Sequence, residues 1–130
     1  YTEDSIADLL LNINRGALGE NGQERYDDLT ESVYPVACSS NYESGTASYN
    51  VANYDTAIEA LSKVVRMDES YDDGGALLTL GLACLDNGDP ESATNYLKRV
   101  NELFPDGEYG EEARTKLDEI AAAASQNTEE

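Results

Sequence analysis

The strongest constraint in this sequence is the spacing of small and apolar residues between positions 74 and 107. Apolar residues there recur every three or four positions in two blocks, first at Leu77, Leu80 and Cys84 and then at Ala93, Leu97 and Val100. Residues at this spacing share one face of a helix. Gly81 lies on the face of the first block and removes a side chain where a second helix can approach closely. The pattern therefore predicts two helices that pack against each other.

The residues between the two blocks are typical of a helix end followed by a helix start. Gly88 suits the position just after a helix, Asp89 suits an N-cap and Pro90 suits the first helical residue. The run Phe104-Pro105-Asp106-Gly107 stops the second helix. One helix pair therefore occupies residues 74–107.

A similar pattern with more drift occupies residues 35–73. Its elements are Tyr42-x2-Gly45, Tyr49, the turn Asn53-Tyr54-Asp55, and Ala57-x3-Leu61. The connection at 68–73 is about two residues longer than the spacing of the other pair requires. Because the residue before a proline disfavours the helical region, we expect a helix to end at Tyr34 and Pro35 to open the next one. Residues 35–73 are therefore expected to form a second helix pair.

The two ends of the chain carry weaker helical patterns. Residues 1–34 are expected to form a divergent helix pair, whose first helix is capped by Thr2 or Asp4. Residues 108–124 carry a final apolar stripe at Tyr109, Ala113, Leu117 and Ile120, with no helix after it to act as a partner. This predicts a capping helix. Residues 125–130 are polar and without periodicity, and are expected to fray.

The spacing Leu77-x2-Leu80-Gly81-x2-Cys84, Ala93-x3-Leu97 and Pro105 resembles the tetratricopeptide repeat, which has a period of about 34 residues. The resemblance implies an all-α fold, a short right-handed superhelix of stacked antiparallel helix pairs with about seven helices and a C-terminal capping helix. We expect one domain over residues 1–124. Such repeats bind other proteins more often than they catalyse reactions, so the expected function is a protein–protein interaction module.

In proteins similar to this one, the first helix of each pair lines a concave groove. Counting around those helices places nine residues there: Tyr42, Glu43, Thr46, Tyr49, Asn50, Leu78, Thr79, Leu82 and Asp86. They form an apolar and aromatic strip edged by acids, so the expected partner is a protein or peptide with apolar anchors and basic flanks. Clamp-type relatives hold a C-terminal carboxylate with Lys, Arg and Asn. This groove has no Lys or Arg before Lys116, which argues against carboxylate capture.

Two alternatives stay open at the level of the sequence. The side chains of Leu78 and Leu82 can instead be covered by the N-terminal helices or by the curvature of the chain, since apolar stripes are more often core than ligand site. The strip can also be buried against a second copy of the chain. In that case the protein is a structural or self-association module with no peptide ligand.

The charge excludes several classes of function. The chain has 27 acids and 8 bases, a net charge of -19, so it repels the phosphate backbone of nucleic acids and anionic lipids. The acids are spread over every segment, which favours a role in solubility over steering of a cationic partner. The chain contains no His, so Ser-His and Cys-His nucleophile pairs are impossible. We therefore expect no enzyme and no cofactor.

Two acidic runs contain the oxygen ligands that calcium prefers. Residues 68–73 and 86–89 are rich in carboxylates, but neither has the alternating ligand spacing of an EF-hand loop. They are more simply helix-terminal turns that use Asp and Asn as caps, so no metal site is predicted. Cys38 and Cys84 are too few for a zinc site and too far apart along the helices for a disulfide. We expect two free thiols.

A last resemblance concerns the location of the protein. The run Phe104-Pro105-Asp106 followed by Tyr109 and Ala113 is similar to a sequence motif common in tetratricopeptide repeat proteins of the bacterial envelope. The resemblance implies an extracytoplasmic domain of a membrane-anchored protein, and a cytoplasmic location stays open. The chain has no run of about 18 apolar residues, so the anchor is expected upstream of Tyr1.

Overall fold

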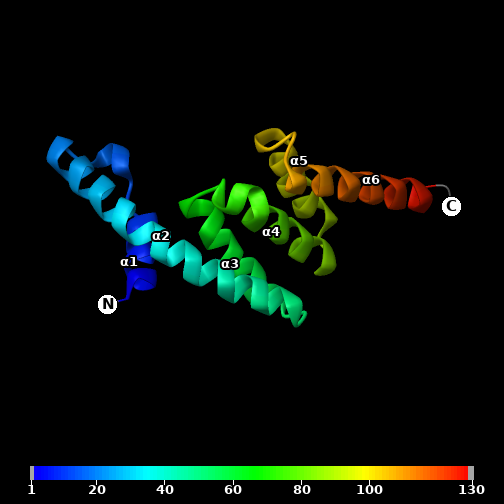
Figure 1. The fold of residues 1–130 in the computed structure, drawn as a ribbon, viewed down its shortest axis with the longest axis horizontal. Helices are drawn as coiled ribbons and strands as arrows, with labels where there is room; N and C mark the ends of the chain where they lie inside the picture. The colour runs from blue at the N-terminus through cyan, green and yellow to red at the C-terminus, as the bar shows by residue number, and fades with distance from the viewer. Residues whose placement is uncertain (1, 129–130) are drawn as a thin grey trace.

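The computed structural model describes residues 2–128, which form six α-helices joined by short connections (Figure 1). The helices are α1 (Glu3–Leu11), α2 (Glu20–Asn50), α3 (Tyr54–Met67), α4 (Gly75–Asp86), α5 (Pro90–Leu103) and α6 (Glu108–Thr128). Two 3₁₀ turns, η1 (Arg15–Ala17) and η2 (Tyr71–Gly74), precede α2 and α4. α1 lies beside α2 toward one end of the molecule, and α6 forms the other end. The expected all-α stack of helix pairs is confirmed, with six α-helices among the described residues in place of about seven.

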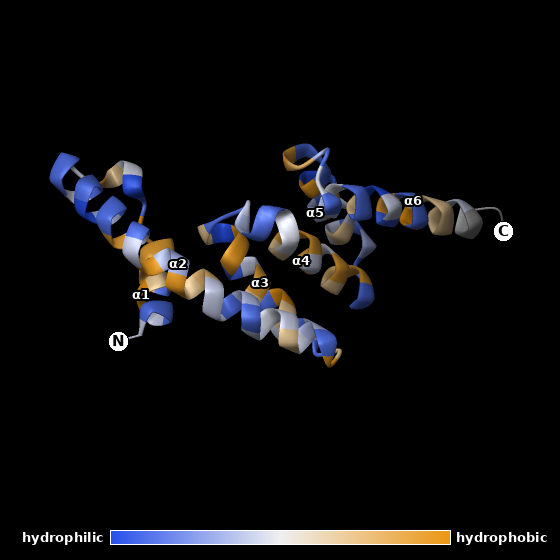
Figure 2. Ribbon diagram, viewed as in Figure 1, coloured by the Kyte–Doolittle hydropathy of each residue, from blue (hydrophilic) through white to orange (hydrophobic). Residues whose placement is uncertain are grey.

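The helices bury their apolar faces against their neighbours in the stack. One cluster of buried side chains joins α3, α4 and α5, and consists of Ala57, Leu61, Leu80, Ala83, Cys84 and Ala93. A second joins α4, α5 and α6, and consists of Leu77, Leu78, Leu97, Val100 and Ala113. Figure 2 shows apolar residues gathered where the helices around α3 and α4 face each other. Each pair is therefore stabilised by the next one, as in other repeat proteins.

Two glycines set how closely the paired helices approach. A Cβ at Gly81 of α4 would lie 3.1 Å from Cγ and Cδ2 of Leu97 on α5, which confirms the predicted helix contact at this position. The equivalent contact in the first pair is tighter. A Cβ at Gly45 of α2 would lie 2.7 Å from Cγ of Leu61 on α3. Both leucines are fully buried, so neither can move aside freely.

Local capping chemistry fixes several helix ends where the sequence predicts them. The side chain of Asp89 accepts a hydrogen bond from the backbone N–H of Ser92 at 3.1 Å, and Pro90 is the first residue of α5. Gly88 has a positive φ of 85° after the end of α4. Thr2 caps α1 through a capping box with the residue three positions later. These predictions are confirmed.

The predicted helix break before Pro35 is wrong. α2 is a single helix of 31 residues that continues through Pro35, so the predicted boundary at residues 34 and 35 falls inside one helix. Pro35 cannot donate a hydrogen bond to the carbonyl of Glu31, a loss of about 3 kcal/mol in a helix interior. Both residues are exposed, so water can solvate that carbonyl. The buried side chains of Ala37 and Cys38 hold the next turn in place. Tertiary packing thus overrides the local preference.

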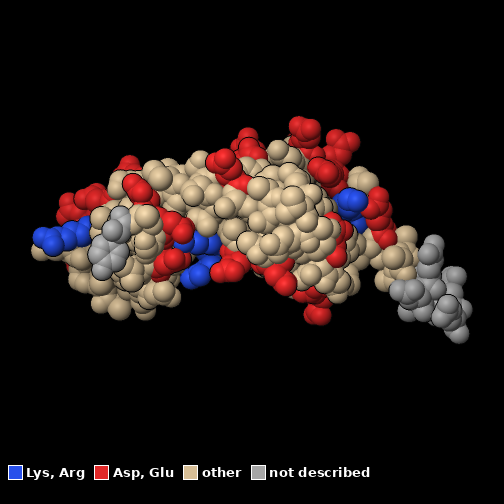
Figure 3. Space-filling view, turned by 90° about the horizontal axis from the view of Figure 1, so that it is seen from below, with Lys and Arg blue, Asp and Glu red and all other residues tan. Residues whose placement is uncertain are grey.

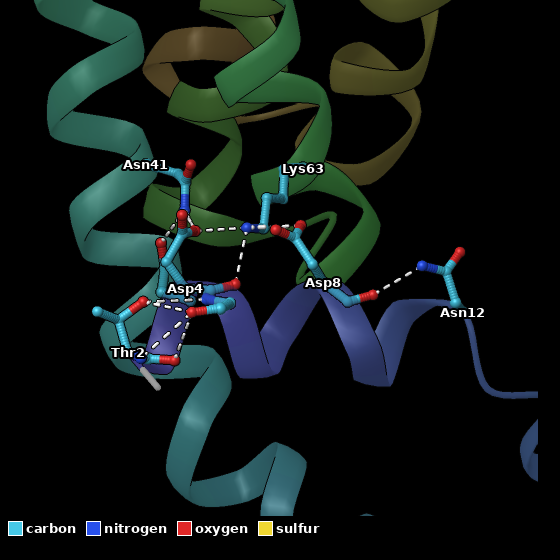
Figure 4. A network of polar contacts seen from close by, with 8 residues as sticks. Thr2, Asp4, Asp8, Asn12, Asn41 and Lys63 are labelled. Carbon is cyan, nitrogen blue, oxygen red and sulfur yellow. Dashed lines mark hydrogen bonds and ion pairs between the residues drawn. The ribbon is translucent and has the colours of Figure 1, made fainter.

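The N-terminal helix α1 is held against α2 and α3 by a polar network (Figure 4). Lys63 of α3 forms ion pairs with Asp4 and Asp8 of α1, the second at 2.7 Å. Asn41 of α2 donates from Nδ2 to Oδ1 of Asp4 at 2.6 Å. The Lys63 side chain is only 13% exposed, whereas the side chains of Asp4 and Asp8 are 49% and 62% exposed, so solvent partly screens both pairs. Beside the network lies a small apolar cluster of Ala7, Leu10, Val33 and Ala37.

The C-terminal helix α6 covers the open side of the last pair. Ala113 is fully buried against α4 and α5, and Leu117 and Ile120 pack around it. This is the capping helix that the sequence predicts. The helix continues to Thr128, beyond the predicted end at residue 124. Residues 129–130 lie outside the described residues, and fraying of the tail stays a prediction.

Candidate partner-binding groove

The helix α4 contacts both α2 and α6, and the three helices form one layer of the stack. At one end of this layer, two tyrosine hydroxyls meet on a single carboxylate oxygen. Tyr42 of α2 donates to Oδ2 of Asp72 at 2.7 Å, and Tyr109 of α6 donates to the same oxygen at 3.5 Å. The ring of Tyr71 packs edge-on against that of Tyr42, with centroids 5.3 Å apart. Asp72 therefore connects the two outer helices of the layer.

The turn before α4 is left-handed, and this brings Asp72 to the tyrosines. The backbone φ is 56° at Asp72, 52° at Asp73 and 97° at Gly74. Asp is one of the few residues other than Gly that adopts this region, although each such residue stores strain of order 1 kcal/mol. A Cβ at Gly75 would lie 2.8 Å from the hydroxyl of Tyr42, so glycine leaves room for the bond to Asp72. The acidic connection at residues 68–73 thus positions the carboxylate of Asp72 beside the tyrosines.

At the other end of the layer, Tyr49 pairs with Asp86. The hydroxyl of Tyr49 on α2 donates to Oδ2 of Asp86, the last residue of α4, at 2.8 Å. The ring of Tyr49 lies against that of Tyr54, with centroids 5.9 Å apart. Burial and then the hydrogen bond to Asp86 raise the pKa of Tyr49 to about 12. The phenol is therefore a neutral donor at physiological pH.

Between these two pairs, α2 carries a surface groove with a volume of about 490 Å³. It is lined by Ser39, Tyr42, Glu43, Thr46, Ala47, Asn50 and Tyr71. The side chains of Glu43 and Asn50 are exposed and can reach a ligand. Oγ1 of Thr46 is buried and has no hydrogen-bond partner among the described residues. The structure thus brings together four of the predicted groove residues, Tyr42, Glu43, Thr46 and Asn50.

The predicted groove residues on α4 divide differently. Leu78 is only 3% exposed and belongs to the cluster that α6 covers, so it is core and not groove surface. Leu82 is half-buried and packs against the same cluster. The hydroxyl of Thr79 donates to the carbonyl of Gly75 at 2.8 Å and is thus used within the helix. Of these four α4 residues, Asp86 alone is exposed.

Three residues at the Asp72 end of the layer are absent from the site that the sequence predicts. Tyr71 and Asp72 lie in the connection at 68–73, which the sequence marks only as a turn rich in acids. Tyr109 belongs to the predicted stripe of the capping helix, and nothing in that stripe indicates Asp72 as its neighbour. The preference of Asp for left-handed turns is the one signal that could have indicated the geometry of Asp72.

The surface around the layer is acidic. Figure 3 shows Asp and Glu spread over the visible face, with Lys and Arg in a few places. Lys116 of α6 forms an ion pair with Glu119 of the same helix at 3.2 Å, and its charge is therefore partly compensated. Glu43, Asp72 and Asp86 are all exposed. The layer thus presents carboxylates together with tyrosine rings.

Cys38 and Cys84 are free, as predicted, and both are buried. Burial, with a smaller contribution from Asp68, raises the pKa of the Cys38 thiol to about 11, so this thiol is protonated and weakly nucleophilic. Within residues 2–128, no group of three or more His, Cys, Asp or Glu side chains is arranged to hold a metal ion. None of the helices in that range is long and apolar enough to span a membrane.

The stacked pairs and the shared inner layer define a helical repeat protein. Residues 75–106, which include α4 and α5, match the family model of the tetratricopeptide repeat. This match supports a tetratricopeptide repeat protein. Repeats of this family generally mediate protein–protein interaction and are typically not enzymes. No curated protein matches the chain.

Proposed function

We propose that the groove along α2 binds an extended segment of a protein partner that carries basic residues and apolar anchors. The observation that supports this is the alternation of tyrosine rings and carboxylates along one layer, with Tyr42 at Asp72 and Tyr49 at Asp86. Tyrosine supplies rigid contact area at low entropic cost, and it is enriched at protein interfaces. The carboxylates complement Lys and Arg side chains.

The tyrosine hydroxyls prepare the carboxylates for such a partner. Both hydroxyls near Asp72 donate to Oδ2, which leaves Oδ1 to accept from an ammonium or guanidinium group. The same holds for Asp86, where Tyr49 donates to Oδ2. Because these bonds fix the carboxylates before binding, little side-chain entropy is lost when a cation arrives. The tyrosine–carboxylate hydrogen bonds of the free protein therefore favour a partner with cationic side chains.

A selection experiment with random peptides tests this proposal. The full chain is immobilised, and a library of random peptides displayed on phage is selected against it. We expect the selected peptides to combine Lys or Arg with bulky apolar residues. Their affinities are then measured for the parent and for the variants Glu43→Gln, Asp72→Asn and Asp86→Asn. Each variant should weaken binding and reduce the on-rate more than the off-rate, because charge mainly steers association.

The control variant is Glu91→Gln, which removes the same charge from the exposed first turn of α5. Rising salt should slow association as the Debye length falls to about 8 Å. Selected peptides without basic residues, or equal affinities for parent and groove variants, would contradict the proposal. The oligomeric state is measured in parallel by sedimentation. A dimer that competes with the peptides would support the alternative of self-association.

We further propose that the domain lies outside the cytoplasm. The basis is the motif Phe104-Pro105-Asp106 with Tyr109 and Ala113, which resembles one in envelope proteins. A protease is added to cells whose outer layers have been removed while the cytoplasmic membrane stays intact, and the native protein is then detected. Protection until the cytoplasmic membrane is lysed would contradict this location.

A further inference from the structure

A second pocket lies beside Pro35, where α2 continues as a single helix. It has a volume of about 560 Å³ and lies where α3 ends and the chain turns away from α2. We call it the Pro35 pocket, and it is lined by Thr30, Glu31, Tyr34, Pro35, Cys38, Met67, Asp68 and Tyr71. Because α2 extends well past the end of α3, no other helix covers its N-terminal half on this side within the described residues. The pocket is open to a partner.

The walls of the pocket are apolar and adaptable. Tyr34, Pro35 and Tyr71 supply rings, and Met67 supplies a flexible thioether that can adjust to the shape of a ligand. Cys38 is 1% exposed and forms part of the buried side of the pocket. Such a lining favours a bulky aliphatic or aromatic side chain over a polar one.

The rim of the pocket is negative. Glu31 and Asp68 are exposed and line it, and none of the residues that line it is basic. One cation, the guanidinium of Arg66, lies near the rim. It partly opposes the rise in the pKa of Tyr34 that burial causes. Two carboxylates and one nearby guanidinium leave a net negative rim, which complements Lys or Arg next to the apolar anchor.

Pro35 adds a hydrogen-bond acceptor to the same rim. Because Pro35 has no N–H, the carbonyl of Glu31 lacks the donor that the helix would otherwise supply. Glu31 is exposed, so this carbonyl can accept a hydrogen bond from water or from a backbone N–H or basic side chain of a partner. Tyr71 lines both the Pro35 pocket and the groove around Tyr42, so the two sites are adjacent.

We propose that the Pro35 pocket is the anchor site of this protein, and that it takes a bulky apolar side chain flanked by Lys or Arg from an extended partner segment. This inference rests on the proposed function, since the same segment would continue into the groove along α2. It assigns the anchor to residues 30–38 and 67–71 and not to the leucines of α4.

The absence of Trp from this chain permits a direct test. The probe is a capped hexapeptide, Gly-Arg-Arg-Trp-Arg-Gly, added to the full chain while the fluorescence of its Trp is recorded. Backbone amide shifts of labelled protein map where it binds. We expect saturable binding with shifts at residues 30–38 and 67–71. Measured by the amide shifts, a peptide with Glu in place of Arg, and one with Ser in place of Trp, should each bind at least about tenfold more weakly, the equivalent of 1.4 kcal/mol.

The decisive variant is Pro35→Ala. Alanine restores the N–H that satisfies the Glu31 carbonyl and improves helix propensity, so this variant should melt at a higher temperature than the parent. It should nevertheless bind the Trp peptide more weakly, which separates loss of the pocket from loss of folding. Glu31→Gln should also weaken binding. Glu59→Gln is its matched control, because Glu59 lies on α3 in a hollow beside α1.

The outcomes separate this inference from the proposed function. If Asp86→Asn weakens the peptide while Pro35→Ala and Glu31→Gln bind like the parent, the groove is supported and the Pro35 pocket is excluded as the anchor site. If the Trp peptide shows no saturable binding, the anchor assignment is also overturned. A dimer that dissociates in Pro35→Ala would mean that a second copy fills the pocket, which likewise overturns it.

Discussion

The hydroxyl of Tyr49 on α2 donates to Oδ2 of Asp86 at the end of α4, across 2.8 Å, and joins the first helices of two successive pairs. About three helical turns separate Asp86 from the start of α4 at Gly75. Just before Gly75, Tyr42 of α2 donates to Asp72. α2 and α4 are therefore tied by a tyrosine–carboxylate bond near each end of α4. Both bonds are open to direct test.

The first prediction concerns the pH dependence of the Tyr49 bond. The pKa of Tyr49 is about 12 in the folded protein, above the value of 10.0 for a free tyrosine. A raised folded pKa stabilises the protein below pH 10, and this stabilisation is lost as the pH rises from 10 toward 12. Tyr49→Phe should lower the free energy of unfolding at neutral pH by ~1 kcal/mol and by less at high pH.

Denaturant unfolding at both pH values measures this difference. Tyr54→Phe is the matched control, because Tyr54 contacts the same ring and forms no bond to Asp86 among the described residues. Equal losses for Tyr49→Phe at neutral and alkaline pH would show that the hydroxyl bond does not contribute.

The second prediction concerns Thr46. Its buried Oγ1 has no hydrogen-bond partner among the described residues, and an unsatisfied buried hydroxyl costs about 1–3 kcal/mol. Thr46→Val keeps the shape and removes the hydroxyl, so it should raise the free energy of unfolding by ~1 kcal/mol. Thr46→Ser keeps the hydroxyl and should give no gain. A loss of stability in Thr46→Val, measured by denaturant unfolding, would indicate a bond to solvent that the valine cannot replace.

The third prediction compares two glycines. At an open helix position, Gly→Ala stabilises by about 1 kcal/mol. At Gly45 the new Cβ would lie 2.7 Å from Cγ of Leu61, and at Gly81 it would lie 3.1 Å from Leu97. Gly45→Ala should therefore lower the free energy of unfolding by ~1 to 3 kcal/mol, and by more than Gly81→Ala.

Thermal and denaturant unfolding of both variants provide the measurement. Leu61→Val in the Gly45→Ala background should cost less than the two changes apart, because the shorter side chain relieves the contact. If the losses in the free energy of unfolding from Gly45→Ala and Leu61→Val simply add, the contact between the new Cβ at position 45 and Leu61 is not the source of the strain.

The fourth prediction concerns the attachment of α1. Hydrogen bonds from Asn41 and then Lys63 lower the pKa of Asp4 below 3.8. A lowered folded pKa stabilises the protein above pH 3.8, and this contribution is lost as the pH falls below that value. Lys63→Met leaves Asp4 and Asp8 without their cation and should speed amide hydrogen exchange throughout α1 at neutral pH.

Lys98→Met serves as the control, since Lys98 is exposed on α5. Exchange in α4 and α5 should stay unchanged in both variants. Unchanged exchange of α1 in Lys63→Met would show that the apolar contacts of Ala7 and Leu10 alone hold the helix.

The fifth prediction concerns the cap. Truncation after Gly107 removes α6 and uncovers the cluster that contains Leu78 and Val100. The truncated chain should expose a continuous apolar surface, bind a hydrophobic dye and associate in solution, as terminal repeats without a cap do. Sedimentation and dye fluorescence measure both effects. A truncated chain that stays folded and monomeric would mean that α6 does not act as a cap.

The sequence by itself determined the elements whose causes are local. Gly88, Asp89 and Pro90 end one helix and begin the next through positive φ, side-chain capping and a fixed backbone angle, and each of these depends on a few adjacent residues. The close approach at Gly81 was also readable, because the helical period places it on the buried stripe of α4. Periodicity and capping therefore sufficed for the helices from residue 54 to residue 107.

The tertiary structure alone decided the features that depend on distant partners. α2 continues through Pro35 because buried contacts on either side outweigh one missing hydrogen bond, a balance that no local pattern expresses. Leu78 is core because α6 covers it, and an apolar residue at helical spacing looks the same in the sequence whether or not a later helix arrives. Asp72 meets Tyr42 and Tyr109 because superhelical stacking brings α2 and α6 to one turn, and only the packing of the helices sets that geometry.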